Sequence, residues 1–404
     1  MAQPDPIPIF EEQETFYTPY FEIKVNGFPL PRGVVRDVIS VTYDDSVDRI
    51  DSFTIEINNW DADRVRTKYL GVEPGPGSPG ESSLFDPGHE LELYMGYQGH
   101  PKANLRLMMT GFITTLEPSF PQSSSPTLTL RGLNIMDRFR RKQFTWAWFG
   151  NDARDSRIAK ELSRQPDRPV GRPGLGIEVR IDDKAAADET PEDYIFMNNQ
   201  YPIVFLMERA RRRGYSIYVG EERTNGSTRR FLNFGPSQQF LRDVTYELEW
   251  GKSLIQATPT LTTTNQISKV TVYGWNRRTN SQIQESVTID DRRFARLNPD
   301  LRAVAREVGR EEEVVNRPVF TEPQARALAF DILQKQLKEA VRIGAATVGL
   351  PDLRAGRTVL LKNLGRRFNG HYFVTSTQHR IDDGGYRTDF TARREETESG
   401  GAAA

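Results

Sequence analysis

The chain has 404 residues, with 54 Lys and Arg against 55 Asp and Glu, and it contains no cysteine. This length predicts two to four domains of ordinary size. The lack of cysteine excludes a disulfide scaffold, a zinc–cysteine site, a thiol nucleophile and an iron–sulfur cluster. A net charge of −1 gives no general attraction to nucleic acid or anionic lipid.

Targeting and membrane signals are absent from the sequence. No apolar run approaches the ~20 residues that a membrane helix needs. Residues 1–6 lack the basic and apolar segments of a signal peptide. We therefore expect no direct membrane insertion, no signal peptide and assembly in the cytoplasm.

The first third of the chain has the pattern of β-strands. Apolar and polar residues alternate over 21–25, 38–43 and 51–57, so that Phe53 and Ile55 share one face. Strand-like segments return at 90–95, 107–116 and 127–130, separated by turn residues. Several short strands with this spacing predict a barrel or a sandwich.

The middle of the chain is predicted to be α+β. Residues 152–164 and 202–213 have helical apolar periodicity, and Gly214 supplies a stop for the second helix. Further along, a capping box at 321–324 starts a helix that is expected to reach about residue 339. The remaining strand-like segments are 216–219, 230–234, 254–261, 267–275, 357–361, 371–378 and 388–392.

The last strand block repeats the first. The segment 88–93 resembles 356–361, 110–115 resembles 369–374, and 125–131 resembles 386–393. In each copy a glycine opens one strand, a second glycine opens the next, and a threonine-containing strand closes the block. The pattern favours two copies of one β module over two unrelated meanders.

Candidate catalytic and metal-binding residues are few. His371 and His379 lie near Asp382 and Asp383, which a metal site would use as ligands, but surface residues around a hairpin are the favoured interpretation. Carboxylate pairs such as Asp44–Asp45 lie in charge-rich stretches where solvation is expected. No serine-nucleophile motif is present. We therefore predict no catalytic residue, no metal and no cofactor.

A basic and aromatic segment is the best candidate for an interface. Residues 138–142 are mostly basic, and four aromatic residues follow within seven positions. This composition is compatible with single-stranded nucleic acid, a protein interface or a solvated helix end. Because the net charge is balanced, we favour an interface or a structural role and no nucleic acid. The candidate interface residues are Trp146, Trp148, Arg140 and Arg141. Trp250 and Trp275 are further candidates, with burial in the core at least as plausible.

Several ordered segments carry a resemblance to a known family. They are Val25-Asn26-Gly27, residues 39–53, Gly111 to Phe120, Leu248 to Leu254, Gln266 to Trp275, Gly349 to Gly356 and residues 364–388. In this order they resemble the late control protein D family, the baseplate hub proteins of contractile phage tails and contractile injection systems. The hub part of type VI valine–glycine-repeat spike proteins is similar. The resemblance covers residues 20–393.

The resemblance implies a β-rich α+β fold with two tube-like antiparallel β-barrels, assembled as a homotrimeric, pseudo-sixfold ring. The expected divisions are an N-terminal extension at 1–18, a first barrel at 19–135, an α+β domain at 136–245, a discontinuous second barrel at 246–278 and 341–395, a charged segment and helix packed outside at 279–340, and a disordered tail at 396–404.

By the same resemblance the chain is a structural hub and not an enzyme. It would adapt a sixfold inner tube to a threefold spike, because duplication within a trimer supplies both symmetries. The implied partners are a separate spike trimer, an inner-tube or tube-initiator protein, and other baseplate proteins. Two alternatives remain open: a tail-associated peptidoglycan hydrolase that uses carboxylates such as Glu117 or Asp193, and a glycan-binding β module.

Overall fold

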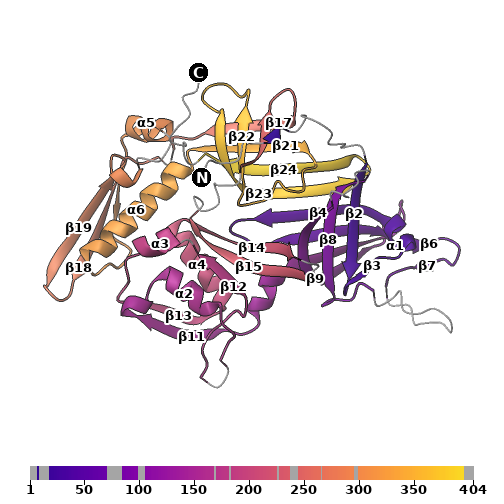
Figure 1. Ribbon diagram of the computed structural model, residues 1–404, viewed down its shortest axis with the longest axis horizontal. Coiled ribbons are helices and arrows are strands. Elements are labelled where there is room, and N and C mark those ends of the chain that lie inside the picture. The colour runs from indigo at the N-terminus through magenta and orange to yellow at the C-terminus, as the bar shows by residue number, and fades with distance from the viewer. Residues whose placement is uncertain are drawn as a thin grey trace.

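The computed structural model describes residues 7–8, 18–70, 84–98, 105–167, 170–181, 183–224, 227–236, 244–264, 266–294 and 299–394. Strands form 49% and helices 20% of the described residues, so the predicted β-rich α+β class is confirmed. Figure 1 shows two groups of strands side by side, with all the labelled helices except the short α1 gathered to one side of them. The expected tail at 396–404 and most of the expected extension at 1–18 lie outside the described residues.

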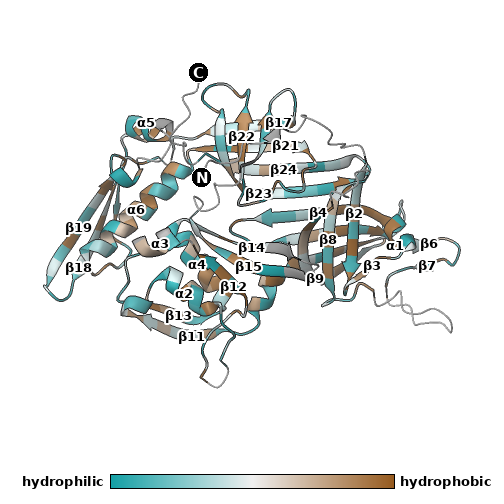
Figure 2. Ribbon diagram, viewed as in Figure 1, coloured by the Kyte–Doolittle hydropathy of each residue, from teal (hydrophilic) through white to brown (hydrophobic). Residues whose placement is uncertain are grey.

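The first strand module contains six main strands. These are β2 (Pro19–Val25), β4 (Val38–Ser46), β5 (Ser52–Asn58), β8 (Glu90–Tyr97), β9 (Arg106–Ser119) and β10 (Thr127–Asn134). Their order is β4-β5-β10-β9-β8-β2, and every neighbouring pair is antiparallel. Phe53, Ile55 and Ile57 of β5 are buried between half-buried neighbours, which confirms the predicted alternation. Strands β2 and β8 show the same banding of hydropathy in Figure 2.

Four short elements lie between the main strands of this module in the sequence. They are β3 (Phe28–Pro29), α1 (Arg32–Asp37), β6 (Trp60–Asp61) and β7 (Arg66–Thr67). Strand β3 pairs with β2 at one edge of the sheet, and β6 pairs with β7 in a separate ribbon.

The second strand module also has six main strands. These are β16 (Val244–Glu249), β17 (Leu254–Leu261), β21 (Val341–Val348), β22 (Thr358–Lys362), β23 (Gly370–Asp382) and β24 (Gly385–Arg393). Their order is β17-β21-β24-β23-β22-β16. Numbered within each module, both orders are 2-3-6-5-4-1, so the sequence repeat is also a repeat of topology. The modules differ at one edge, because β16 is parallel to β22 whereas β2 is antiparallel to β8.

The expectation of two closed barrels is wrong for the described residues. The strands of both modules belong to one open 14-stranded sheet, which also includes β1 (Ile7–Pro8) paired in parallel with β16. Strand β23 is much longer than its neighbour β22: residues 370–373 pair with β22, and residues 376–381 pair with β4 of the first module. The overhanging backbone groups of β23 thereby find partners on β4. Of the four edge strands of the two modules, only β4 takes part in this joint, and its partner β23 is an inner strand of the second module.

The part between the modules is α+β. It contains the 3₁₀ turns η2 (Ile135–Arg140) and η3 (Gly150–Asp152), β11 (Phe144–Phe149), α2 (Asp155–Leu162), β12 (Glu178–Ile181), α3 (Asp183–Asp188), β13 (Tyr194–Gln200), α4 (Pro202–Arg213), β14 (Tyr215–Thr224) and β15 (Ser227–Pro236). Helix α4 matches the predicted bounds, with Pro202 in its first turn and Gly214 in the left-handed conformation after it.

A further part lies outside the second module. It contains β18 (Lys269–Asn276), β19 (Ser281–Thr288), the 3₁₀ turn η5 (Arg292–Phe294), α5 (Pro299–Val308), β20 (Glu311–Val314) and α6 (Glu322–Lys338). The hydroxyl of Thr321 accepts the Gln324 N–H, as the capping box predicts. The strand expected in the second barrel at 267–275 instead lies in a separate sheet, β19-β18-β20, packed against α6.

Candidate functional site at the joint of the strand modules

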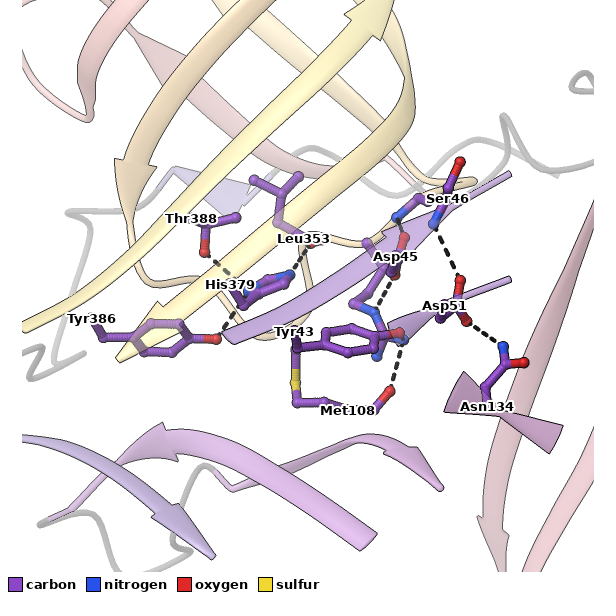
Figure 3. Close-up of polar contacts among 12 residues, drawn as sticks. Tyr43, Asp45, Ser46, Asp51, Met108, Asn134, Leu353, His379, Tyr386 and Thr388 are labelled. Atoms are coloured by element: carbon purple, nitrogen blue, oxygen red, sulfur yellow. Dashed lines mark hydrogen bonds and ion pairs between the residues drawn. The ribbon is translucent and has the colours of Figure 1, made fainter. Parts of the chain in front are cut away.

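The loop 349–357 of the second module crosses to the first module and is held there by Arg354. Nε of Arg354 donates to an Asp45 carboxylate oxygen at 2.6 Å. Nη2 of Arg354 donates to the Met108 carbonyl at 2.8 Å and to the Tyr43 hydroxyl at 2.5 Å (Figure 3). Tyr43 and Asp45 lie on β4, and Met108 lies on β9. One guanidinium therefore ties two strands of the first module to the second module.

Asp45 is buried by the alternation of β4. Val41 and Tyr43 face the interior, and Asp45, two positions further on, is only 6% exposed. One carboxylate oxygen accepts from Arg354, and the other accepts the Ala355 N–H at 2.9 Å. The expected solvation of this carboxylate is wrong, because its partners lie about three hundred residues away and leave no local signal.

A second carboxyl group, Asp51, lies beside this joint. Its oxygens accept from the Asn134 side chain at 2.7 Å and from the Ser46 N–H at 3.2 Å. Burial, reinforced by the nearby Asp45 carboxylate, raises the pKa of Asp51 to about 8. The adjacent hollow of about 520 Å³ over the joined sheets is lined by Asp44 and Asp45, and Asp51 is not among its lining residues.

His379 is a buried structural residue and not a surface residue as expected. Its Nε2 lies 3.0 Å from the Leu353 carbonyl, which can only accept, so Nε2 carries the proton. Its Nδ1, which has one lone pair, lies 3.0 Å from the Tyr386 hydroxyl and 3.1 Å from the Thr388 hydroxyl, and either can donate to it (Figure 3). Burial, followed by the charge of Arg354, lowers the pKa of His379 to about 3. Within the described ranges, no cluster of three His, Asp or Glu side chains could hold a metal ion.

Gly349 gives the loop its close approach to the sheet. The Tyr97 hydroxyl donates to the Gly349 carbonyl at 2.9 Å. A Cβ on Gly349 would lie 2.0 Å from Cγ of Tyr386, which is buried and bonded to His379. Only glycine allows the loop to pass over this ring.

We expect Gly349→Ala to lower the free energy of unfolding by about 1–3 kcal/mol, because the added methyl group must displace a packed aromatic ring. Gly344→Ala is the matched control, since Gly344 lies on β21 of the same module and a Cβ there meets nothing within 4 Å. Urea denaturation of the two variants measures the difference. Equal stability of the two variants would contradict the close approach.

The four candidate interface residues lie together around η2 and β11. Trp148 is 3% exposed, stacks on Phe205 at 5.6 Å, and donates to the Glu161 carboxylate at 2.8 Å. Trp146 is half-buried below the Arg172 guanidinium, Arg140 pairs with Asp137, and Arg141 is exposed. In this chain Trp148 is therefore a core residue.

Other aromatic residues are more accessible. Trp250 is 45% exposed and Trp275 is 50% exposed, so the interpretation of these two as core residues is wrong. Trp250 follows β16 at a turn and Trp275 lies near the end of β18, where few neighbours cover a side chain. Sequence reasoning could not decide this, because exposure depends on which sheet each strand joins.

The carboxylates considered for hydrolysis are dispersed. Glu117 is exposed on β9 and forms an ion pair with Arg131 at 3.0 Å, whereas Asp193 precedes β13 in the α+β part. The basic run at 209–213 is partly internal: Arg209 and Arg213 both bond to Asp155, which is fully buried. These contacts stabilise the packing of α2 against α4.

Comparison with solved structures relates the whole architecture to tail proteins. The 43 kDa tail protein of prophage MuSo2 from Shewanella oneidensis matches with a TM-score of 0.63 and 16% identity, over 93% of this chain and 98% of that chain. A tail protein from Neisseria meningitidis MC58 matches with a TM-score of 0.58 and 13% identity, over 94% and 97%. An Escherichia coli type VI secretion component, described as similar to T4 tail proteins, matches with a TM-score of 0.53 and 10% identity, over 95% and 79%.

The chain has the fold of phage tail and type VI secretion proteins. This tail-protein fold extends over nearly the full length of the chain and confirms the resemblance seen in the sequence. A family described as the Alg8 N-terminal domain matches residues 205–383, which begin inside α4 and end inside the β23–β24 hairpin. No curated protein matches the sequence. In the described part of the chain, no helix is long and apolar enough to cross a membrane.

Proposed function

We propose that this chain is a structural baseplate hub, a homotrimer that adapts a sixfold inner tube to a threefold spike. The observation that carries the proposal is the repeat of the 2-3-6-5-4-1 strand order within one chain. Three chains with two such modules each present six related faces to a tube and three identical faces to a spike. The tail-protein fold of the whole chain supports the same assignment.

The proposed role is mechanical rather than catalytic. The buried polar joint keeps the two modules in one fixed relation, as a ring of equivalent faces requires. The proposed partners are a separate spike trimer, an inner-tube or tube-initiator protein and neighbouring baseplate proteins. Trp146 and Arg141 remain proposed contacts for such neighbours, and the particle would assemble in the cytoplasm.

Native mass spectrometry of the purified chain, alone and mixed with its spike protein, tests the proposal. We expect a trimer, or a complex of three chains with three spike chains. A monomer under both conditions would contradict the hub. A peptidoglycan-release assay tests the hydrolase alternative, which would require activity that Glu117→Gln or Asp193→Asn abolishes.

A further inference from the structure

The joint inside the chain is a strand pairing with a defined register. The second half of β23 runs antiparallel to β4, with Thr377 opposite Asp45, His379 opposite Tyr43 and Ile381 opposite Val41. Numbered within each module, strand five of the second module pairs with strand two of the first. The chain contains one more strand at each of these positions: β9 is strand five of the first module, and β17 is strand two of the second.

Irregularities in the strands give the residue-by-residue equivalence of the modules. The register of β4 on β5 skips Ile39, and the register of β17 on β21 skips Ile255; both isoleucines are exposed. The register of β10 skips Thr114 on β9, and that of β24 skips Thr375 on β23. Because bulges mark fixed positions in a sheet, β17 corresponds to β4 and β9 to β23 without gaps.

The two strands equivalent to the joined pair have free edges in the described part of the chain. Strand β17 pairs with β21 and with no other named strand. On β9, residues 106–112 pair with β8, whereas residues 114–119 extend past β8 and pair with β10 alone. This overhang is the counterpart of the β23 overhang that pairs with β4.

We infer that the overhang of β9 in one copy pairs with β17 of the next copy, in the register of the internal joint. The equivalence places Leu116 opposite Leu261, Pro118 opposite Pro259 and Phe120 opposite Ala257. The contact is head-to-tail, so its repetition around three chains closes a ring of six modules. This inference rests on the proposed function, since it names the surface through which the proposed trimer forms.

The side chains on the two free edges support this pairing. At the internal joint, Thr377, His379 and Ile381 of β23 are buried. Their counterparts are Leu116 and Pro118 on β9 and Phe120 directly after it, which are apolar yet half-buried or exposed, with Phe120 at 62%. On β17 the inward positions are likewise apolar and half-buried: Ala257, Pro259 and Leu261. An exposed apolar row along an unpaired edge is typical of a strand that pairs with another chain.

The proposed intermolecular joint differs from the internal joint in two ways: it has no ion pair, and it has prolines at one pair of opposed positions. When Gly356 is aligned with Gly88, Asp86 takes the position of Arg354, and Leu261 of β17 takes the position of Asp45. The proposed joint therefore has no counterpart of the Arg354–Asp45 ion pair. The opposed prolines, Pro118 and Pro259, have no N–H to donate. Prolines on edge strands discourage pairing with unrelated strands. We therefore expect a contact that is weaker than the internal joint and that forms only in the matched register.

Paired cysteines test the register directly, because the chain has no cysteine of its own. The side chains of Gln378, which is exposed, and Asp44, which is half-buried, meet across the internal joint at 2.7 Å. Their counterparts are Glu117 and Thr260, both exposed, so the double variant Glu117→Cys with Thr260→Cys is expected to fold normally. On oxidation it should form covalent dimers and trimers. The control is Glu117→Cys with Gln256→Cys, four residues along β17 and ~13 Å out of register, too far for a disulfide.

The possible outcomes separate this inference from the hub itself. Trimers that do not cross-link, or that cross-link equally in the control, would overturn the edge pairing and leave the hub standing. A chain that stays monomeric with its spike protein would overturn both.

A substitution on the same edge gives an independent measurement. Phe120→Asp should raise the concentration at which trimers dissociate by at least about tenfold, since it places a charge in the apolar row. Phe149→Asp is the matched control, because Phe149 is 67% exposed and lies on β11, which pairs with β13 in a separate sheet that contains neither edge. Equal effects of the two substitutions would contradict the pairing.

Discussion

Replacing Arg354 by Met is expected to lower the free energy of unfolding by about 3–5 kcal/mol, the usual result of leaving a buried charge without its partner. Asp45 is 6% exposed, and Arg354 supplies one of its two charged or polar partners. The Tyr43 hydroxyl and the Met108 carbonyl lose a partner as well. Urea denaturation, with melting temperature as a second readout, measures the loss.

The same loop offers a control for this substitution. Arg106 forms an ion pair with Asp352 at 3.2 Å, and both side chains are about half exposed. Arg106→Met should cost no more than about 1 kcal/mol, since water solvates both charges. In addition, Arg354→Met should cost less in an Asp45→Asn background than alone. Similar losses for both arginines, or strict additivity with Asp45→Asn, would show that the joint does not depend on this ion pair.

Two single substitutions at the joint are expected to give the pH dependence of stability opposite signs. The folded pKa of His379 is lowered to about 3 from 6.5, so the unfolded chain binds a proton there that the folded chain refuses. The stability contributed by neutral His379 is therefore complete above pH 6.5 and is lost as the pH falls toward 3.

Asp51 acts in the opposite direction. Its folded pKa is raised to about 8 from 3.8, so the folded chain keeps a proton that the unfolded chain releases. Its contribution is therefore complete below pH 3.8 and is lost as the pH rises to about 8. Between pH 4 and 6.5 the two groups offset each other.

His379→Gln should remove the contribution that makes stability rise with pH and leave the contribution of Asp51. Relative to the unsubstituted protein, the variant should lose stability with rising pH by up to about 1.4 kcal/mol per pH unit between pH 4 and 6.5. Asp51→Asn is the control, and its difference from the unsubstituted protein should have the opposite slope. Unfolding free energies measured across this range give both slopes. Parallel profiles for all three proteins would show that neither group titrates as the structure implies.

The joint also bears on how the hub would work. In the proposed hub, a rigid relation between the modules would keep six faces matched to a tube. The contacts of Arg354, Gly349 and His379 all meet at one loop. That loop, 349–357, contains a segment on which the family resemblance depends. Gly349, Arg354 and the neighbouring His379 hold the loop against the sheet. The segment is therefore explained by the packing of the fold.

Local signals were enough to predict much of the secondary structure. Alternation identified β5, and the combination of Pro202, apolar periodicity and Gly214 gave both ends of α4. The glycine-opened strands revealed the repeat that the strand order then displayed. These features depend on residues within a few positions of each other, where the backbone geometry alone relates sequence to structure.

Features that depend on distant partners were not available from the sequence. Asp45 meets Arg354 across the joint, His379 is buried by the loop at 353, and β18 leaves the second module for its own sheet. Whether a sheet closes on itself or joins its neighbour depends on where the overhang of β23 finds a partner. The sequence by itself determined the two modules and their shared pattern, because alternation and turns are local. Only the tertiary structure decided which edges pair and which charges are buried, because those depend on residues brought together by the whole fold.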